Sequence, residues 1–306
     1  MQRIALFLAT KKGLIALEKL ISEGRSNNIK QVFTFKEVNV DKSYDEDIVN
    51  LCISNNIPVH YWEDSKYNLL DYFLDANITS AFAIGWRYLI SLDINEILET
   101  NLIVFHDSLL PKYRGFSPTP TAIICGETII GVTALFASDK IDAGDIVLQS
   151  KIEISNNEYI SEIIDRQSEL YSSMLIKIIS QIESNTLVSM KQDEALATYS
   201  IWRDIADCQI DWTESSTDIF NLIRAVSTPY PGAYTYYHGK KIIVNRAQVT
   251  NDLTFQKRDA GKIWNINNGK PQIICGNGML EILDARYENG ENVIFTSLRS
   301  RMNSKL

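Results

Sequence analysis

The sequence predicts a doubly wound α/β domain followed by a small β-barrel domain. Short apolar strands alternate with amphipathic helices in the first half of the chain, the pattern of a parallel sheet with helices on both faces. After residue 232, short alternating strands recur between His-Gly and Asn-Gly turns, which favours a small barrel. Residues 184–200 hold few large apolar side chains and are predicted to be a linker. We therefore place one domain at residues 1–200 and a second at 201–306.

The first domain is predicted from its hydrophobic periodicity. Apolar runs of strand length lie at residues 3–9, 30–35, 58–62, 79–84, 102–105, 131–137 and 146–154. Helical spacing of apolar residues is found in a segment opening at Gly13, at 48–53, at 69–74 and in a long stripe from about 158 to 184. The last two strands are expected to be antiparallel edge strands, with Asp142 at the tip of their hairpin.

The second domain is predicted to start with Asp211-Trp212 and a helix at residues 216–225. The sequence Pro229-Tyr-Pro-Gly232 then breaks the chain, because proline and glycine favour turns. Short strands are expected to follow at residues 233–237, 241–249, 261–266, 272–275, 279–285 and 293–295.

Composition excludes several classes of protein. The formal net charge of −8 disfavours a nucleic-acid partner, which normally binds a basic face. No apolar run reaches transmembrane length, and the apolar start is too short for a signal peptide. Four scattered cysteines and three histidines offer no metal-ligand spacing. We expect a cytoplasmic protein with reduced thiols, no metal and no membrane contact, either a monomer or a homodimer.

Polar residues begin where the strand at 102–105 ends, with His106. Ligands of open α/β sheets bind beyond the carboxyl ends of strands, so this position suits chemistry. His106 and the hairpin residue Asp142 could form an acid–base pair. Alternatively, His106 only caps the strand and Asp142 is a turn residue beside Gly144.

Two further loops could contribute to such a site. Pro111 and Gly115 define a tight loop expected to display Lys112, Tyr113 and Arg114. Arg114 offers a planar fork suited to phosphate or carboxylate.

The strand at 79–84 also ends in polar and aromatic residues, Gly85-Trp-Arg-Tyr-Leu-Ile90, and their alternative role is core packing by Trp86 and Tyr88. Lys11 and Lys12, after the first strand, are expected to be solvated, and their alternative role is to meet an anionic acceptor together with Lys112 and Arg114.

The string His106-Asp-Ser-Leu-Leu-Pro-Lys-Tyr-Arg-Gly115, followed by Ile141-Asp-Ala-Gly-Asp-Ile146, resembles the 10-formyltetrahydrofolate-dependent formyltransferase family. The run from Asp211-Trp212 to Pro229-Tyr-Pro-Gly-Ala233 resembles the carboxyl-terminal domain of the same family, which is similar to an OB barrel. The resemblance thus implies a Rossmann-like formyltransferase domain and an OB-like domain, with N10-formyltetrahydrofolate as co-substrate.

The resemblance also implies roles for individual residues. His106 would donate to the oxyanion of the tetrahedral intermediate, and Asp142 would orient His106 or collect the amine proton. The folate would be bound by Gly85, Trp86, Arg87, Tyr88, Leu89, Ile90, Phe136, Ile141 and Asp142. The acceptor would be bound by Ser108, Lys112, Tyr113 and Arg114. The family has Asn where this chain has Val104, so one oxyanion donor is missing, as it is in folate-hydrolysing relatives.

The resemblance is strongest to the sugar N-formyltransferase branch, which implies a nucleotide-linked amino sugar as acceptor. The loop at residues 36–44 contains Glu37 and Asp41 and lacks the basic, glycine-rich composition expected for gripping transfer RNA. The alternatives are formylation of methionyl-transfer RNA, formylation of an aminoacyl group on a carrier protein, hydrolysis of formyl-folate, and folate binding without transfer.

Overall fold

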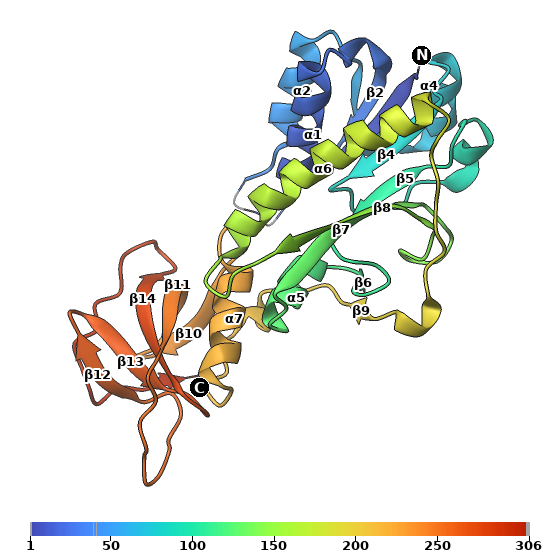
Figure 1. Cartoon of the computed structure of the whole chain (residues 1–306). Coiled ribbons are helices and arrows are strands. Elements are labelled where there is room, and N and C mark those ends of the chain that lie inside the picture. The colour runs from blue at the N-terminus through green and yellow to red at the C-terminus, as the bar shows by residue number, and fades with distance from the viewer. Residues whose placement is uncertain (1, 39, 41, 304–306) are drawn as a thin grey trace. The chain divides into compact units, whose positions relative to one another are not determined.

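A computed structural model of the chain describes residues 2–38, 40 and 42–303 (Figure 1). The chain divides into two compact units that are each described separately. The first unit contains Met1–Pro118, Ile129–Glu153 and Glu162–Ile201, and the second contains Thr119–Thr128, Ile154–Ser161 and Trp202–Leu306.

The first unit is built on a seven-stranded sheet with the strand order β3-β2-β1-β4-β5-β7-β8. The first five strands of this order are parallel, and β5–β7 and β7–β8 are antiparallel, which confirms the predicted architecture. Strands β4 and β5 are direct neighbours, so their carboxyl ends lie at the same edge. The strands are β1 (Ile4–Leu8), β2 (Ile29–Thr34), β3 (Val59–Tyr61), β4 (Ser80–Ile84), β5 (Ile103–His106), β7 (Ile129–Phe136) and β8 (Ile146–Glu153).

Helices cover both faces of this sheet (Figure 1). The alternation of β1 shows why, since Ile4, Leu6 and Leu8 point to one apolar cluster while Ala5 and Phe7 point to another. The first cluster is closed by α1 (Thr10–Ser22), α2 (Asp45–Ser54) and α6 (Ile160–Glu183), and the second by α3 (Trp62–Ser65) and α4 (Leu69–Asp75). Short 3₁₀ turns are η1 (Ser26–Asn28), η2 (Lys66–Asn68), η3 (Leu92–Glu96), η4 (Glu194–Leu196) and η5 (Ala206–Cys208).

Three predicted elements of the first unit differ from the structure. Helix α1 begins at Thr10, and Gly13 lies inside it, where a Cβ atom would be 3.1 Å from Leu8 Cβ. Trp62 starts a helix rather than ending a strand. The predicted linker at residues 184–200 is wrong in its later part, because β9 (Tyr199–Ser200) pairs with β6 (Arg114–Gly115) and Met190 pairs with Ile146.

The second unit is a curled antiparallel sheet with the strand order β12-β13-β14-β11-β10-β15, together with α5 (Pro118–Ile124) and α7 (Ser216–Val226). Its outermost strands are linked by an antiparallel bridge between Lys262 and Arg301, so the sheet curls toward a barrel. The strands are β10 (Ala233–Tyr237), β11 (Lys240–Thr250), β12 (Ile263–Asn267), β13 (Lys270–Ile274), β14 (Met279–Tyr287) and β15 (Met302–Asn303).

The predicted strand at residues 293–295 is wrong, since that segment makes a single backbone bond to Ala285 and the last ladder position is taken by β15.

Among the described residues, no helix combines the length and apolar character needed to cross a membrane. All four cysteines are free thiols, and burial raises the pKa of Cys52 and Cys275 to about 12.

The turn after β4 requires glycine at position 85 because of its positive φ and because a side chain would clash there. A matched pair of glycine variants can separate the two effects. Gly85 has φ +66°, and a Cβ atom there would be 2.3 Å from the Ala9 carbonyl oxygen. Gly24 has a similar φ of +72° with open space around it. We expect Gly24→Ala to cost about 1 kcal/mol of unfolding free energy from backbone strain alone. Gly85→Ala should cost at least twice as much in chemical denaturation, and equal losses would contradict the proposed clash.

Candidate active site

The structure brings His106 and Asp142 together at the carboxyl end of β5. His106 is only 8% exposed, and its Nε2 lies 2.7 Å from the carbonyl oxygen of Tyr113. A carbonyl can only accept, so Nε2 carries a hydrogen and the ring is fixed with Nδ1 on the opposite side. His106 Nδ1 faces Asp142 Oδ2 at 3.5 Å.

The Asp142 carboxylate is aimed by the backbone around it. Asp142 lies in the loop between β7 and β8 with φ +48°, and its Oδ2 accepts the N–H of Gly115 at 2.8 Å. Its side chain is 20% exposed, so it remains open to solvent while it is held. Gly115 has φ +99°, and a Cβ atom there would be 2.5 Å from the Ser200 carbonyl oxygen. Glycine is therefore required for the chain to present this N–H to Asp142.

Gln192 is a residue of the site that the sequence analysis missed. Its Nε2 donates to the carbonyl oxygens of Asp142 and Gly144, both at 2.8 Å. Its Oε1 accepts from Arg114 Nη2 at 2.8 Å and from Arg114 Nε at 3.2 Å. One amide side chain thus links the Asp142 loop to the loop that follows His106. The linking contacts are hydrogen bonds of one side chain to residues far away in the chain, and they leave no periodic signal in the sequence.

The segment around Gln192 also binds both loops through its backbone. We refer to residues 190–200 as the strap. The Arg114 N–H donates to the Thr198 carbonyl at 2.9 Å, and the Phe116 N–H donates to the Ser200 carbonyl at 3.1 Å. At the other end, Ile146 and Met190 exchange two backbone hydrogen bonds of 2.7 and 2.8 Å. The strap therefore fixes the separation of the two loops that carry the site.

The structure places the predicted acceptor-binding residues in different environments. Lys112 is exposed and Tyr113 is half-buried. The expectation that the loop displays Arg114 is wrong, because Arg114 is 1% exposed and its guanidinium also pairs with Glu194 at 2.8 Å. Ser108 is 4% exposed and donates its hydroxyl hydrogen to the Lys112 carbonyl at 2.6 Å, so it shapes the turn.

An ion pair between the buried Lys12 and the partly buried Asp107 lies directly after His106 in the chain. Asp107 accepts from Lys12 Nζ and from the Tyr171 hydroxyl. Burial alone would raise the pKa of Asp107, but the charge and hydrogen bond of Lys12, helped by Tyr171, hold it below its usual range. Burial, with the Asp107 charge, raises the pKa of Tyr171 well above its usual value. The expectation of a solvated Lys12 is wrong, while Lys11 pairs with Asp165 at 2.6 Å in partial solvent exposure.

The loop after β4 combines packed rings with open positions. Trp86 packs against Phe7, Phe35 and Trp62 with ring centroids 5.2 Å apart in each case, and Tyr88 packs on Phe35. In contrast, Leu89 is 95% exposed. Trp86 Nε1 is buried without a hydrogen-bond partner in the described part of the chain, which is unusual for a buried donor.

The remaining residues predicted for the folate site lie on this loop and near Asp142. Arg87 pairs with Glu37 at 2.5 Å, and burial raises the pKa of Glu37 although Arg87 opposes the shift. Ile90 and Phe136 are half-buried, and Ile141, next to Asp142, is 63% exposed. No cluster of three or more His, Cys, Asp or Glu residues suited to a metal occurs among residues 2–38, 40 and 42–303.

Comparison with known proteins gives matches over nearly the whole chain. The sequence model of a family described as formyl transferase matches residues 3–179, and one described as formyl transferase, C-terminal domain, matches residues 204–300. A methionyl-tRNA formyltransferase of Fusobacterium nucleatum is 29% identical over 244 residues, covering 79% of this chain and 78% of that protein. The bifunctional polymyxin resistance protein ArnA of Wigglesworthia glossinidia brevipalpis is 32% identical over 251 residues, 81% of this chain but only 37% of that protein.

Solved structures share the fold. An N-formyltransferase of Helicobacter canadensis, in complex with folinic acid and dTDP-3-aminofucose, superposes with a TM-score of 0.66 at 19% identity, covering 92% of this chain and 99% of that one. The sugar 3N-formyl transferase WlaRD, with dTDP and 5-N-formyl-THF, gives a TM-score of 0.69 at 20% identity, covering 94% and 98%.

The Gln192 contacts make a prediction about the Asp142 loop. Gln192→Ala leaves two carbonyls without donors and removes one partner of the buried Arg114, so we expect a loss of about 1–3 kcal/mol in unfolding free energy. Amide hydrogen exchange at residues 142–146 should become faster. The neighbouring variant Lys191→Ala, which truncates an exposed side chain, should change neither measurement. Unchanged exchange in Gln192→Ala would mean that the strap does not hold this loop.

Proposed function

Since the chain belongs to the formyl transferase family and is a formyltransferase enzyme, we propose that it formylates the amine of a nucleotide-linked amino sugar, with N10-formyltetrahydrofolate as formyl donor, in the cytoplasm. The observation that carries this proposal is the His106–Asp142 pair, held at the carboxyl end of β5 with the carboxylate on the Gly115 N–H. An acid–base pair beside a polarising backbone suits acyl transfer to an amine.

In the proposed reaction the amine of the acceptor attacks the formyl carbon on N10 of the folate. A C–N bond forms, and the tetrahedral intermediate carries an oxyanion and a cationic nitrogen. Asp142 takes the proton from that nitrogen. The oxyanion then reforms the carbonyl as the bond between the formyl carbon and N10 breaks, and N10 takes up the proton that Asp142 had accepted, which releases tetrahydrofolate and the N-formyl sugar. His106, held by the Tyr113 carbonyl through Nε2, is the proposed hydrogen-bond donor to the oxyanion.

Val104 limits the number of oxyanion donors. It lies on β5 between Ala83 of β4 and Leu135 of β7, partly buried against apolar side chains. Its side chain offers no hydrogen bond, and losing one such donor costs about 3 kcal/mol of transition-state stabilisation in other enzymes. We propose that His106 supplies a correspondingly larger share of the oxyanion stabilisation in this protein.

We propose that the folate binds beside the Gly85–Ile90 loop, Phe136 and Ile141. The buried Nε1 of Trp86 is a donor without an acceptor in the described chain, which supports a ligand at this loop. The exposed Leu89 and Ile141 side chains supply apolar surface of the kind that lines ligand sites. Two solved structures of the same fold were determined with folinic acid or 5-N-formyl-THF, which supports a folate as the co-substrate.

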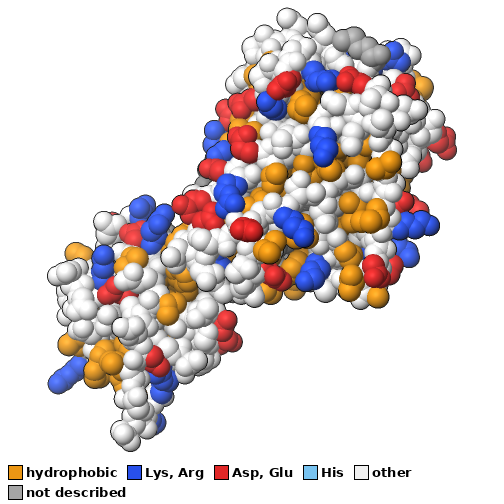
Figure 2. Space-filling model, in the orientation of Figure 1, with side chains coloured by type: hydrophobic (Ala, Val, Ile, Leu, Met, Phe, Trp, Pro, Cys, Tyr) orange, Lys and Arg blue, Asp and Glu red, His pale blue; other side chains and the backbone are white. Residues whose placement is uncertain are grey.

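Three observations favour a nucleotide sugar over transfer RNA as acceptor. The chain is acidic, and on the face drawn in Figure 2 the Lys and Arg side chains are scattered among Asp and Glu rather than gathered into one surface. In the predicted loop at 36–44, Glu37 is buried against Arg87, and Lys42 pairs with Asp47 at 2.8 Å. Asn39 and Asp41 of that loop lie outside the described residues. Transfer RNA binding needs many free cations, whereas a diphosphate needs one or two.

Lys112 is the candidate for the acceptor phosphates, because it is exposed on the loop that follows His106. The similarity to a methionyl-tRNA formyltransferase keeps transfer RNA as the second candidate acceptor. An aminoacyl group on a carrier protein, hydrolysis of formyl-folate and folate binding without transfer are the other outcomes that an assay can reveal.

Substitutions at the pair test the mechanism. Asp142→Asn removes the proton acceptor, and His106→Asn removes the imidazole donor, so we expect turnover to fall by about 10²–10⁴-fold with the fold retained. Asp145→Asn, the same change in the same loop, should remain close to wild type. Steady-state formyl transfer and a thermal melt of each variant provide the measurements. Near-wild-type turnover in Asp142→Asn would remove Asp142 from the mechanism.

The acceptor is tested by mass spectrometry of reaction products. Given N10-formyltetrahydrofolate, the purified protein should add one formyl group to at least one nucleotide-linked amino sugar in a broad panel. Initiator methionyl-transfer RNA should remain unformylated under the same conditions. Efficient formylation of the transfer RNA with an inert sugar panel would overturn the sugar assignment and leave formyl transfer standing.

A further inference from the structure

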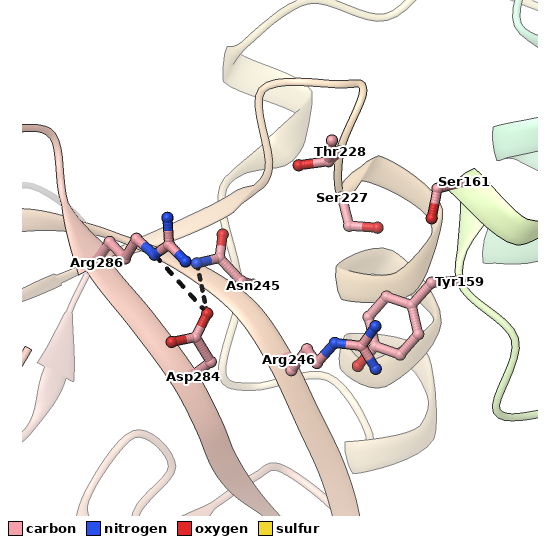
Figure 3. Close-up of a pocket in the computed structure, with 8 residues that line it drawn as sticks. All are labelled: Tyr159, Ser161, Ser227, Thr228, Asn245, Arg246, Asp284 and Arg286. Atoms are coloured by element: carbon pink, nitrogen blue, oxygen red, sulfur yellow. Dashed lines mark hydrogen bonds and ion pairs between the residues drawn. The ribbon is translucent and has the colours of Figure 1, made fainter. Parts of the chain in front are cut away.

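The second unit contains a polar cavity of about 240 Å³ that the proposed reaction does not use (Figure 3). Every side chain that lines it carries a polar group, and all of these residues belong to the second unit. By the same measure of volume, a single water molecule needs only roughly 10–15 Å³, so the cavity has room for a small solute. The lining residues are Tyr159, Ser161, Ser227, Thr228, Asn245, Arg246, Asp284 and Arg286.

A β-bulge directs two neighbouring side chains into this cavity. In the pairing of β11 with β14, Val244 is opposite Ala285 and Arg246 is opposite Asp284, so Asn245 is an extra residue. Neighbours on a regular strand point to opposite faces, but here Asn245 and Arg246 both line the cavity. Bulges re-aim side chains in this way next to functional sites.

The cavity has an excess of positive charge. The Arg246 guanidinium lies 4.7 Å from the centre of the Tyr159 ring and has no carboxylate partner within 4 Å among the described residues. Arg286 Nε lies 4.0 Å from Asp284 Oδ2. That same Oδ2 accepts from Asn245 Nδ2 at 2.8 Å. The cavity therefore holds two guanidinium groups and one carboxylate that is already hydrogen-bonded, and within the described part of the chain neither guanidinium donates a hydrogen bond.

The cavity wall is also fixed in place before any ligand binds. The Tyr159 hydroxyl exchanges hydrogen bonds with the N–H and carbonyl of Ala247, at 3.2 and 3.3 Å. The buried Arg224 donates to the carbonyl of Glu158, directly before Tyr159, at 3.2 Å. The ring beneath Arg246 is thereby held, and little ordering is required when a ligand binds.

We propose that this cavity binds the phosphoryl group of a small phosphate ester. Guanidinium forks match phosphate oxygens, and the hydroxyls of Ser161, Ser227 and Thr228 supply further donors on the opposite side in Figure 3. An apolar ligand finds no apolar side chain in the lining, and a cation meets two arginines. A dianion neutralises the excess charge and still leaves Asp284 opposed by an arginine.

The test is isothermal titration calorimetry on the full-length protein, with inorganic phosphate and ribose 5-phosphate as separate probes. Wild type should bind ribose 5-phosphate at one site per chain, and Arg246→Gln and Arg286→Gln should each weaken binding at least tenfold. The control Lys270→Gln removes one exposed positive charge from the same unit and should leave binding unchanged. Arg286 is half exposed, so its variant remains informative if Arg246→Gln disturbs folding.

A second test looks for tighter phosphate binding in a variant, a result that misfolding would not produce. Asp284→Asn keeps the shape of the side chain and removes the negative charge, so it should strengthen phosphate binding several-fold. Tighter binding of ribose 5-phosphate than of inorganic phosphate identifies an ester as the ligand, and equal binding identifies the phosphoryl group alone. Absence of binding to wild type, or binding unaffected by both arginine variants, would overturn the proposal. Binding of a short RNA but of neither small probe would also overturn it.

Discussion

The candidate active site depends on one side chain that performs no chemistry. Gln192 donates two hydrogen bonds to the carbonyls of Asp142 and Gly144, and it accepts two hydrogen bonds from the Arg114 guanidinium. Asp142 has an unfavourable positive φ, and such a conformation persists only when the surroundings determine it. The strap, which comes from a separate part of the chain, holds the Asp142 loop in this conformation through its hydrogen bonds. The distance between Asp142 and His106 is therefore a property of three segments together.

Buried charge makes this arrangement specific as well as stable. Arg114 and Asp107 lie on either side of the turn that follows His106, and each is paired, Arg114 with Glu194 and Asp107 with Lys12. A buried charge that loses its partner is strongly destabilising, so alternative positions of this turn are disfavoured. The fixed turn in turn holds the Tyr113 carbonyl against His106 Nε2. The orientation of the imidazole thus depends, through this turn, on ion pairs that lie outside the His106–Asp142 contact.

Sequence patterns predicted the parts of this site that depend on local order. The strand ending at His106 and the hairpin carrying Asp142 follow from periodicity, and the structure confirms both elements. The roles of Lys12, Arg114 and Gln192 could not be predicted from sequence patterns. Each depends on a partner between 48 and 95 residues away in the chain, and a contact of that kind imposes no spacing on the sequence. Composition alone also suggested that a polar stretch such as 184–200 was a linker.

The residues around the candidate site fall into two groups, buried side chains that are held by hydrogen bonds and ion pairs, and exposed side chains that are not. The groups that position His106 and Asp142 are buried and mutually satisfied, so changing one disturbs the others. The neighbouring apolar side chain of Phe116 is 56% exposed and offers no hydrogen bond to that network. A change at Phe116 therefore leaves the network intact. Solved structures of sugar formyltransferases share this fold. Exposed positions outside the network are the ones at which proteins of one fold can differ while the buried arrangement around His106 and Asp142 is kept.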